Sequence, residues 1–166
     1  GVVGALNMSG ETVWRTELGA YETTLGFGSA ASPTLHGERL YLVNDNVEQS
    51  FMVAIDKNSG EVIWRVERPE RGQNWATPFV WENEVRTEVV TSGTQGVRSY
   101  DTDGNLLWEI HGMSGLTIPT PFAKHGLLYI SSGYPGGGLR PVYVVKPGAS
   151  GDISLWSRED MRTGLS

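Results

Sequence analysis

Tryptophan recurs along this chain at a nearly constant interval, and this recurrence limits the possible folds more than any other feature. Trp14, Trp64, Trp108 and Trp156 are separated by 50, 44 and 48 residues in a chain of 166 residues. The first three each end a similar phrase, in which a small residue is followed by Asn or Asp, then by Gly and then by Trp. The fourth copy is looser and has an enlarged turn. Internal repeats of this length are typical of arrays of one supersecondary unit.

A second marker, a Ser-Pro or Thr-Pro pair, repeats in phase with the tryptophans. Its prolines, Pro33, Pro78 and Pro121, are 45 and 43 residues apart. A turn and a β-rich run, for example residues 40–43 or 127–130, follow the pair. A tight Asx/Gly turn then joins two more runs before each tryptophan. The two markers together predict a unit of about four short strands.

The length of the unit selects the architecture. Units of four strands at about 40–50 residues match the blades of a β-propeller, whereas leucine-rich, ankyrin and tetratricopeptide units are shorter and mostly contain helices. The composition agrees, because 22 Gly and 8 Pro suit a turn-rich β chain. A β-sandwich is the alternative all-β fold, but it has no period of this size. We therefore predict an all-β chain of propeller blades, each built from four antiparallel strands.

The same markers predict the domain organisation. Dividing the chain by a period near 47 gives about three and a half units, whereas a closed propeller needs about four or more blades. The chain begins without Met and enters a strand-like run at once. The sequence therefore predicts an incomplete ring, a single partial domain over residues 1–166 with blades at about 1–18 (partial), 19–68, 69–112 and 113–160.

The motif of residues 54–64, AxDxxSGxxxW in one-letter code, resembles the tryptophan-docking repeat of the pyrroloquinoline-quinone (PQQ)-type β-propellers. The resemblance covers nearly the whole chain. It implies that the Trp of one blade packs against the Ala and the turn backbone of its neighbour. Quinoprotein dehydrogenases, outer-membrane assembly lipoproteins and many binding modules share these blades, so the repeat indicates fold rather than function. The residues expected to carry the repeat are Trp14, Trp64, Trp108, Trp156, Gly10, Gly60, Gly104, Pro33, Pro78 and Pro121.

Strand connectivity predicts which end of the blades carries a site. If the strands of a blade alternate in direction, the turns after the first and third strands share one end, and these are mostly short and regular. The other connections share the opposite end and are irregular: residues 19–31, 44–50, 68–76, 93–96, 111–119 and 133–141. Such loops on a rigid scaffold are frequent binding sites. The candidate ligand-binding residues are Tyr21, Thr24, Phe27, Arg71, Gln73, Asn74, Trp75, His111, Thr117 and Tyr134, with Trp75 favoured over Trp81 as an aromatic contact.

Some local patterns suggest chemistry but have a structural explanation. Residues 101–105, DTDGN, resemble part of a calcium loop, but no Glu completes it and the neighbouring copies differ. A capped turn explains all copies, so we expect no metal site. The histidines are scattered, and His36 and His125 occupy equivalent turns, which favours a structural role over a zinc or catalytic pair. The glycine-rich segment 134–138 precedes a strand-like run and is interpreted as a loop, not a phosphate site.

Charge and missing residue types exclude other classes of function. A net charge of −6 leaves no broad basic surface for nucleic acid or anionic lipid. The absence of Cys removes disulfides, thiolate metal sites and Cys nucleophiles. No nucleophile elbow, Walker loop or His-Glu-x-x-His motif is present. The chain has no run of 18 apolar residues, so we expect no membrane span.

These observations predict a noncatalytic binding or scaffold module whose loops meet a protein, glycan or small-molecule partner. The resemblance implies a bacterial exported protein, periplasmic or extracellular. It also implies an alternative, a segment of a PQQ-dependent dehydrogenase with quinone and calcium, whose cofactor ligands would lie mostly outside this chain because no residue here can be matched to them. No catalytic, cofactor-binding or metal residue is assigned. A third hypothesis is self-association through the open strand edges and uncovered faces of the end blades.

Overall fold

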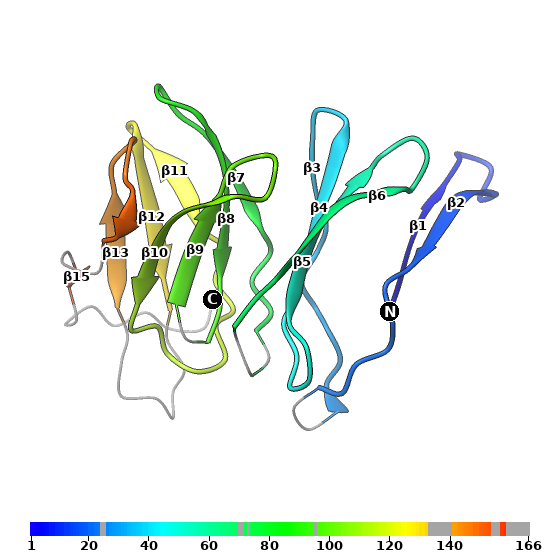
Figure 1. The fold of residues 1–166 in the computed structure, drawn as a ribbon, viewed down its shortest axis with the longest axis horizontal. Coiled ribbons are helices and arrows are strands. Elements are labelled where there is room, and N and C mark those ends of the chain that lie inside the picture. The colour runs from blue at the N-terminus through cyan, green and yellow to red at the C-terminus, as the bar shows by residue number, and fades with distance from the viewer. Residues whose placement is uncertain are drawn as a thin grey trace.

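The chain is an all-β partial propeller, as the repeat predicts. The computed structural model describes residues 1–23, 26–69, 72, 74–94, 96–132, 141–153 and 157–158. Within these ranges, 15 strands form four sheets that stand side by side (Figure 1). In the same ranges, no helix is long and apolar enough to cross a bilayer.

Three of the sheets contain at least four strands. The first sheet pairs only β1 (Val2–Leu6) with β2 (Thr12–Glu17). The second runs in the order β3 (Thr34–His36), β4 (Arg39–Asn44), β5 (Phe51–Asp56) and β6 (Val62–Glu67). The third contains β7 (Phe79–Glu82), β8 (Thr87–Ser92), β9 (Gly96–Tyr100) and β10 (Leu106–His111). The fourth contains β11 (Phe122–Lys124), β12 (Leu127–Ser131), β13 (Val142–Val145) and β15 (Ser157–Arg158).

One short strand leaves its own unit. β14 (Gly151–Asp152) follows β13 in the chain but pairs in parallel with Trp108 and Glu109 of β10. It therefore adds a fifth strand to the third sheet. Every other strand pairing in the described residues is antiparallel.

The hydrophobic cores lie between the sheets. Val89 and Val90 are neighbours in β8, yet they belong to different clusters because successive side chains of a strand point to opposite faces. Val89 packs with Tyr41 of the second sheet, and Val90 packs with Trp108 and with Leu128 of the fourth. The third sheet is therefore buried on both faces, which fixes it firmly between its neighbours.

The antiparallel registers separate two ends of the propeller segment (Figure 1). We call the upper end in Figure 1 the turn end; it carries residues 7–11, 37–38, 57–61, 83–86, 101–105, 125–126 and 146–150. We call the lower end the loop end; it carries the described residues of 18–33, 45–50, 68–78, 93–95, 112–121 and 132–141. The turns are short and regular, whereas the loops are longer and irregular.

Two tryptophans dock onto the next sheet as the resemblance implies. Trp14 Nε1 donates to Lys57 O at 2.8 Å, and Trp64 Nε1 donates to Thr102 O at 2.9 Å. Gly60 allows this contact, because a Cβ on it would lie 2.6 Å from Cε3 of Trp14. Gly60 also has φ +77, which favours glycine. The absence of a side chain at Gly60 therefore makes room for the docked Trp14 ring.

The third tryptophan behaves differently. Trp108 Nε1 donates at 2.6 Å to Glu88 Oε2, a carboxylate of its own sheet. Trp108 is still buried, with 1 % of its surface exposed, and packs in the core between the third and fourth sheets. Trp108 therefore packs against the neighbouring sheet, but unlike Trp14 and Trp64 it does not hydrogen-bond to the turn of that sheet. Trp156 lies outside the described residues.

The Pro phrases and the turn glycines have their own structural roles. Thr34 Oγ1 donates to Pro78 O at 2.6 Å, which links the phrase at Pro33 to its copy in the third sheet. Pro121 directly precedes β11. Gly10 and Gly104 have φ +83 and +89 in their turns, where glycine avoids the strain of a left-handed backbone.

Candidate functional site

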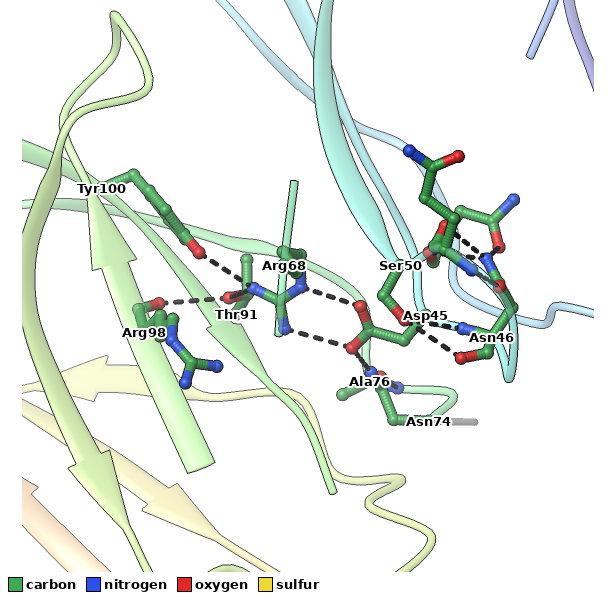
Figure 2. A network of polar contacts seen from close by, with 11 residues as sticks. Asp45, Asn46, Ser50, Arg68, Asn74, Ala76, Thr91, Arg98 and Tyr100 are labelled. Carbon is green, nitrogen blue, oxygen red and sulfur yellow. Dashed lines mark hydrogen bonds and ion pairs between the residues drawn. The ribbon is translucent and has the colours of Figure 1, made fainter. Parts of the chain in front are cut away.

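A buried ion pair anchors the loop end between the second and third sheets (Figure 2). Asp45 follows β4, and Arg68 follows β6. Arg68 Nε donates to Asp45 Oδ1 at 2.7 Å, and Nη2 donates to Oδ2 at 3.1 Å. Neither side chain has any exposed surface. A bidentate, fully buried pair of this kind restricts the geometry of both side chains, so it holds the start of both loops in place.

The guanidinium of Arg68 also reaches the third sheet. Its Nη1 donates to Thr91 Oγ1 at 2.6 Å and to Tyr100 OH at 3.3 Å, as Figure 2 shows. Burial alone lowers the pKa of Arg68, but attraction to the Asp45 carboxylate and the contact with Tyr100 outweigh burial and raise that pKa above its ordinary value. Arg68 therefore remains a cation in the interface between the second and third sheets and links them. We call such an interface between two neighbouring sheets a joint.

Two asparagines extend this anchor into the loops. Asn74 Nδ2 donates to Asp45 Oδ2, and Asn74 Oδ1 accepts from Ala76 N at 3.0 Å. Asn46 Oδ1 accepts from the amides of Glu48 and Gln49 at 2.9 and 2.7 Å, which closes the β4–β5 loop. These hydrogen bonds between side chain and backbone hold residues 45–49 and 74–76 in place.

The structure brings only some of the predicted site residues together. Asn74, Trp75 and Thr117 are neighbours, since Trp75 N donates to Thr117 O at 2.9 Å. Asn74 and Thr117 are 3 % and 0 % exposed, and Trp75 is half-buried. Thr117 Oγ1 bonds to Gly93 O at 3.2 Å. Two members of this group are thus held inside the loop end, and Trp75 stays the predicted contact of the three.

The other predicted residues are dispersed. Tyr21 packs on Phe51, with ring centroids 5.5 Å apart, and its hydroxyl accepts from Arg65 at 3.3 Å. His111 is exposed, with Nε2 3.6 Å from Glu109 Oε1. Phe27 is 68 % exposed. Thr24, Arg71, Gln73 and Tyr134 lie outside the described residues.

Sequence reasoning missed Asp45 and Arg68 as a pair. Both positions fall inside the predicted irregular connections 44–50 and 68–76. Charged residues in loops usually face solvent, so nothing in the composition marks them as buried. The signal that could have found them is their placement directly after two strands of one blade, which brings an acid and a base to the same end.

The calcium-like segment forms a capped turn. Asp101 Oδ1 accepts from the amides of Asp103 and Asn105 at 2.9 and 2.8 Å. Burial raises the pKa of Asp101, but its hydrogen bonds from Asn105 and the turn amides outweigh this, and the net pKa lies below the ordinary range. Asp56 and Asn7 cap their turns in the same way.

The other patterns singled out in the sequence also occupy structural positions. Among the described residues, no group of three or more His, Cys, Asp or Glu is arranged to hold a metal ion. His36 Nδ1 lies 3.5 Å from Glu82 Oε1, and His125 adopts φ +54 in its turn. Trp81 is 2 % exposed in the core between the third and fourth sheets.

The described residues do not fit the quinone and calcium of PQQ-dependent enzymes. An anionic quinone needs cationic donors that face it, and Ca²⁺ needs several oxygen ligands at one place. At the loop end, Arg68 is enclosed with Asp45 and bonds to groups of the protein. The carboxylates of Asp56 and Asp101 bond to the amides of their own turns. We therefore derive no chemistry through that cofactor.

Comparison with known proteins agrees with the partial propeller fold described above. A PQQ_2 family profile, described as outer membrane protein assembly factor BamB, matches residues 1–159. The chain belongs to this family. The crystal structure of BamB from Moraxella catarrhalis is similar in fold, with a TM-score of 0.59 and 16 % sequence identity over 96 % of this chain. The match spans 42 % of that BamB chain. No curated protein sequence matches.

Proposed function

We propose that this chain is a noncatalytic scaffold that presents the loop end of its blades to a protein partner. The supporting observation is the buried Asp45–Arg68 pair, which holds the start of two loops from within and leaves residues 47–49 exposed. A loop that is already ordered loses less conformational entropy on binding. The family description, an outer membrane protein assembly factor, supports a periplasmic setting and a partner in outer membrane protein assembly.

Apolar side chains on three loops provide the contact surface for such a partner. Val47, Phe27 and Ile118 are 43 %, 68 % and 39 % exposed, and they lie on the β4–β5, β2–β3 and β10–β11 connections. Val47 is two residues from Asp45 and next to the capping residue Asn46. Exposed apolar residues on a preorganised loop are suited to a protein interface, where burial of apolar area stabilises the complex.

Site-specific photo-crosslinking tests the proposal. A benzophenone amino acid is placed singly at Val47, Phe27 and Ile118, and as a control at Met8, a fully exposed apolar residue of the turn end. In intact cells we expect the three loop-end positions to give an adduct with the same envelope protein and Met8 to give none. Excess co-expressed chain without the crosslinker should suppress the adduct.

Two results would overturn the proposal. One is the absence of a shared adduct from the three loop-end positions. The other is dye-linked oxidation of alcohols or sugars by the purified chain after incubation with PQQ and Ca²⁺, because that activity would favour the dehydrogenase alternative.

A further inference from the structure

The second, third and fourth sheets form two joints, and these differ at the turn end. The first difference is at the strand position of Arg39. In the joint between the second and third sheets, Arg39 crosses to the turn of the next sheet. Its Nη1 donates to Asp103 Oδ1 at 2.8 Å and also to Thr102 O, the carbonyl that accepts from Trp64. A tryptophan and an arginine therefore converge on one turn and occupy the space between the sheets.

In the third sheet the equivalent position is acidic. The register pairs Tyr41 with Ala54 and Ala54 with Trp64, and likewise Val90 with Ser99 and Ser99 with Trp108. Two residues before Tyr41 is Arg39, and two residues before Val90 is Glu88. A carboxylate thus replaces the cation that crosses the preceding joint.

Glu88 is held inside its own sheet. Its Oε2 accepts from Trp108 Nε1 and Ser99 Oγ at 2.6 Å each, and its Oε1 accepts from Arg86 Nε at 3.0 Å and Asn83 Nδ2 at 3.2 Å. The side chain has no exposed surface. The Trp108 ring still packs against the fourth sheet, but neither its Nε1 nor the Glu88 side chain bonds to the turn of that sheet.

The turn of the fourth sheet also lacks its cap. Val144 pairs with Tyr129 at the position of Ala54 and Ser99, so Lys146 stands where Asp56 and Asp101 cap their turns. A lysine side chain has no acceptor for the turn amides. The chain runs on instead to β14, which pairs with β10, and Arg86 donates to Ala149 O. The turn is thereby drawn toward the outer strand of the third sheet.

An open cleft of about 580 Å³ lies at this altered joint. Its wall from the third sheet contains Glu82 and Glu84, and its wall from the fourth contains Lys124 and Lys146, with Trp81 and Leu127 between them. All four charged residues are exposed. This volume is in the range of ligand sites, about 300–1,000 Å³. The cleft therefore has an acidic wall, a basic wall and apolar material between the two.

The charges of the two walls do not pair with each other. Glu82 lies 3.5 Å from His36 on the second sheet. Within the described residues, Glu84, Lys124 and Lys146 have no ion-pair partner. A ligand with one basic and one acidic group on either side of an apolar group would complement both walls at once. In an extended peptide, every second side chain points to the same face, so a sequence of basic, apolar and acidic residues at alternate positions presents these groups together.

We propose that this cleft is a second interaction surface, which binds an extended peptide segment carrying a basic, an apolar and an acidic side chain at alternate positions. It lies at the end opposite the loops and is independent of the proposed loop-end scaffold function. Its origin is the change from Arg39 to Glu88 and from Asp101 to Lys146 between equivalent positions. The bound segment would lie against the turn of the fourth sheet, toward which no side chain at the Arg39 position crosses.

Fluorescein-labelled peptides test this proposal with the 166-residue chain. The probes are Lys-Ser-Leu-Ser-Glu and Glu-Ser-Leu-Ser-Lys, which cover both chain directions, with Lys-Ser-Leu-Ser-Lys and Glu-Ser-Leu-Ser-Glu for comparison. In fluorescence anisotropy we expect one mixed-charge probe to saturate below about 1 mM, a weak affinity on the usual scale. Amide shifts in NMR spectra should fall on Trp81, Ala123 and Leu127, which line the cleft.

Charge reversal supplies the decisive control. The double variant Lys124→Glu/Lys146→Glu should bind the mixed probe about tenfold more weakly and the Lys-Ser-Leu-Ser-Lys probe more tightly than the wild type does. Lys57→Glu, on another turn, should leave both affinities unchanged. If the double variant loses its β-sheet spectrum, Lys124→Ala and Lys146→Ala are measured singly, each with an expected loss of about threefold.

Any of four results would overturn the proposal. These are no saturable binding of either mixed probe, shifts confined to the loop end, equal affinity of wild type and charge-reversed variant, or failure of the doubly basic probe to gain affinity for the charge-reversed variant. Crosslinking at Val47 should be unaffected by the same lysine variants, so failure here and failure of the loop-end proposal can be told apart.

Discussion

The joint between the second and third sheets and the joint between the third and fourth are built from the same repeat, yet different interactions hold them. In the first, Trp64 and Arg39 bond to the turn of the neighbouring sheet. In the second, Trp108 bonds to Glu88 of its own sheet, and strand β14 makes the crossing contact instead. The tryptophan alone therefore does not determine how a blade docks, because the residues at the Arg39 and Asp101 positions also differ between the two joints.

The loop ends of the two joints differ as well. Arg68 and Asp45 form a buried charged pair in the first joint. In the second, Tyr143 OH donates to His111 O at 2.9 Å, a bond between neutral groups. Buried charges must remain paired, whereas a neutral hydrogen bond contributes modestly. The first joint should therefore be the more sensitive to loss of a single partner.

The largest effect is expected from Asp45→Ala. It leaves Arg68 buried without its counter-ion, and we expect a loss of about 3–5 kcal/mol in the free energy of unfolding. Tyr143→Phe, the matched change in the second joint, should cost about 0.5–1.5 kcal/mol. Urea unfolding at pH 7 measures both. Replacing the whole pair, as Asp45→Leu/Arg68→Met, should recover part of the loss. Equal costs for the two single variants would contradict the asymmetry.

A smaller effect is expected where a docked ring meets a turn. Gly60→Ala places a methyl group 2.6 Å from the ring of Trp14 at φ +77. We expect about 2–4 kcal/mol of destabilisation from strain and overpacking together. In Gly37→Ala the backbone is similarly left-handed, with φ +58, but nothing lies within 4 Å, so only the strain of about 1–2 kcal/mol remains. Thermal unfolding of the two variants separates backbone strain from overpacking against the Trp14 ring. A Gly37 variant as unstable as the Gly60 variant would rule out a contribution from the ring.

The two tryptophan hydrogen bonds can be compared directly. Trp108→Phe removes a bond to the carboxylate of Glu88, for which we expect about 1.5–3 kcal/mol. Trp64→Phe removes a bond to a peptide carbonyl, for which about 0.5–1.5 kcal/mol is expected. Both changes delete the same ring atoms, and Trp108 is also the more buried ring, so burial and acceptor both favour the larger loss of stability at Trp108; urea midpoints measure the two losses. If Trp64→Phe were the more costly change, the contact between Trp108 and Glu88 would not be the main hydrogen bond of its joint.

The fold could be predicted from the sequence because the residues that mark the repeat act locally. Trp14, Trp64 and the capping residue Asp56 each act within one hairpin or on the adjacent turn, so their spacing suffices to predict blades and docking. The departure at Trp108 was not predictable from the motif. Its cause, Glu88, lies 20 residues earlier and becomes its neighbour only through the strand register.

The candidate site was harder to predict than the fold for the same reason. Connectivity places Asn74, Trp75 and Thr117 at one end, and they do lie together. Burial depends on what crosses from another blade, as Arg68 does to Thr91. A cleft such as that between Glu84 and Lys124 arises from a missing contact, which single-residue patterns do not reveal. Long-range packing, rather than local propensity, governs these features.

The smallest effect concerns the turn caps and appears only with acid. The pKa of Asp101 lies below its ordinary value in the folded chain, because hydrogen bonds from Asn105 and the turn amides outweigh burial. Its contribution to stability is therefore complete above the unfolded pKa, near 3.9, and is lost as the pH falls through the lower folded value. Asn7 caps the first turn by accepting from the amides of Ser9 and Glu11 at 2.9 Å each. Asp101→Asn should therefore preserve the two amide bonds and remove the titration, and the Asn105 side-chain amide, which now donates to Asp101 Oδ2, must turn over to accept instead. Urea midpoints at pH 7, 5, 4 and 3 should show the variant close to wild type at neutral pH and losing less stability in acid. Equal loss of stability in acid for the variant and the wild type would mean that the amides of this turn do not favour the charged form of Asp101.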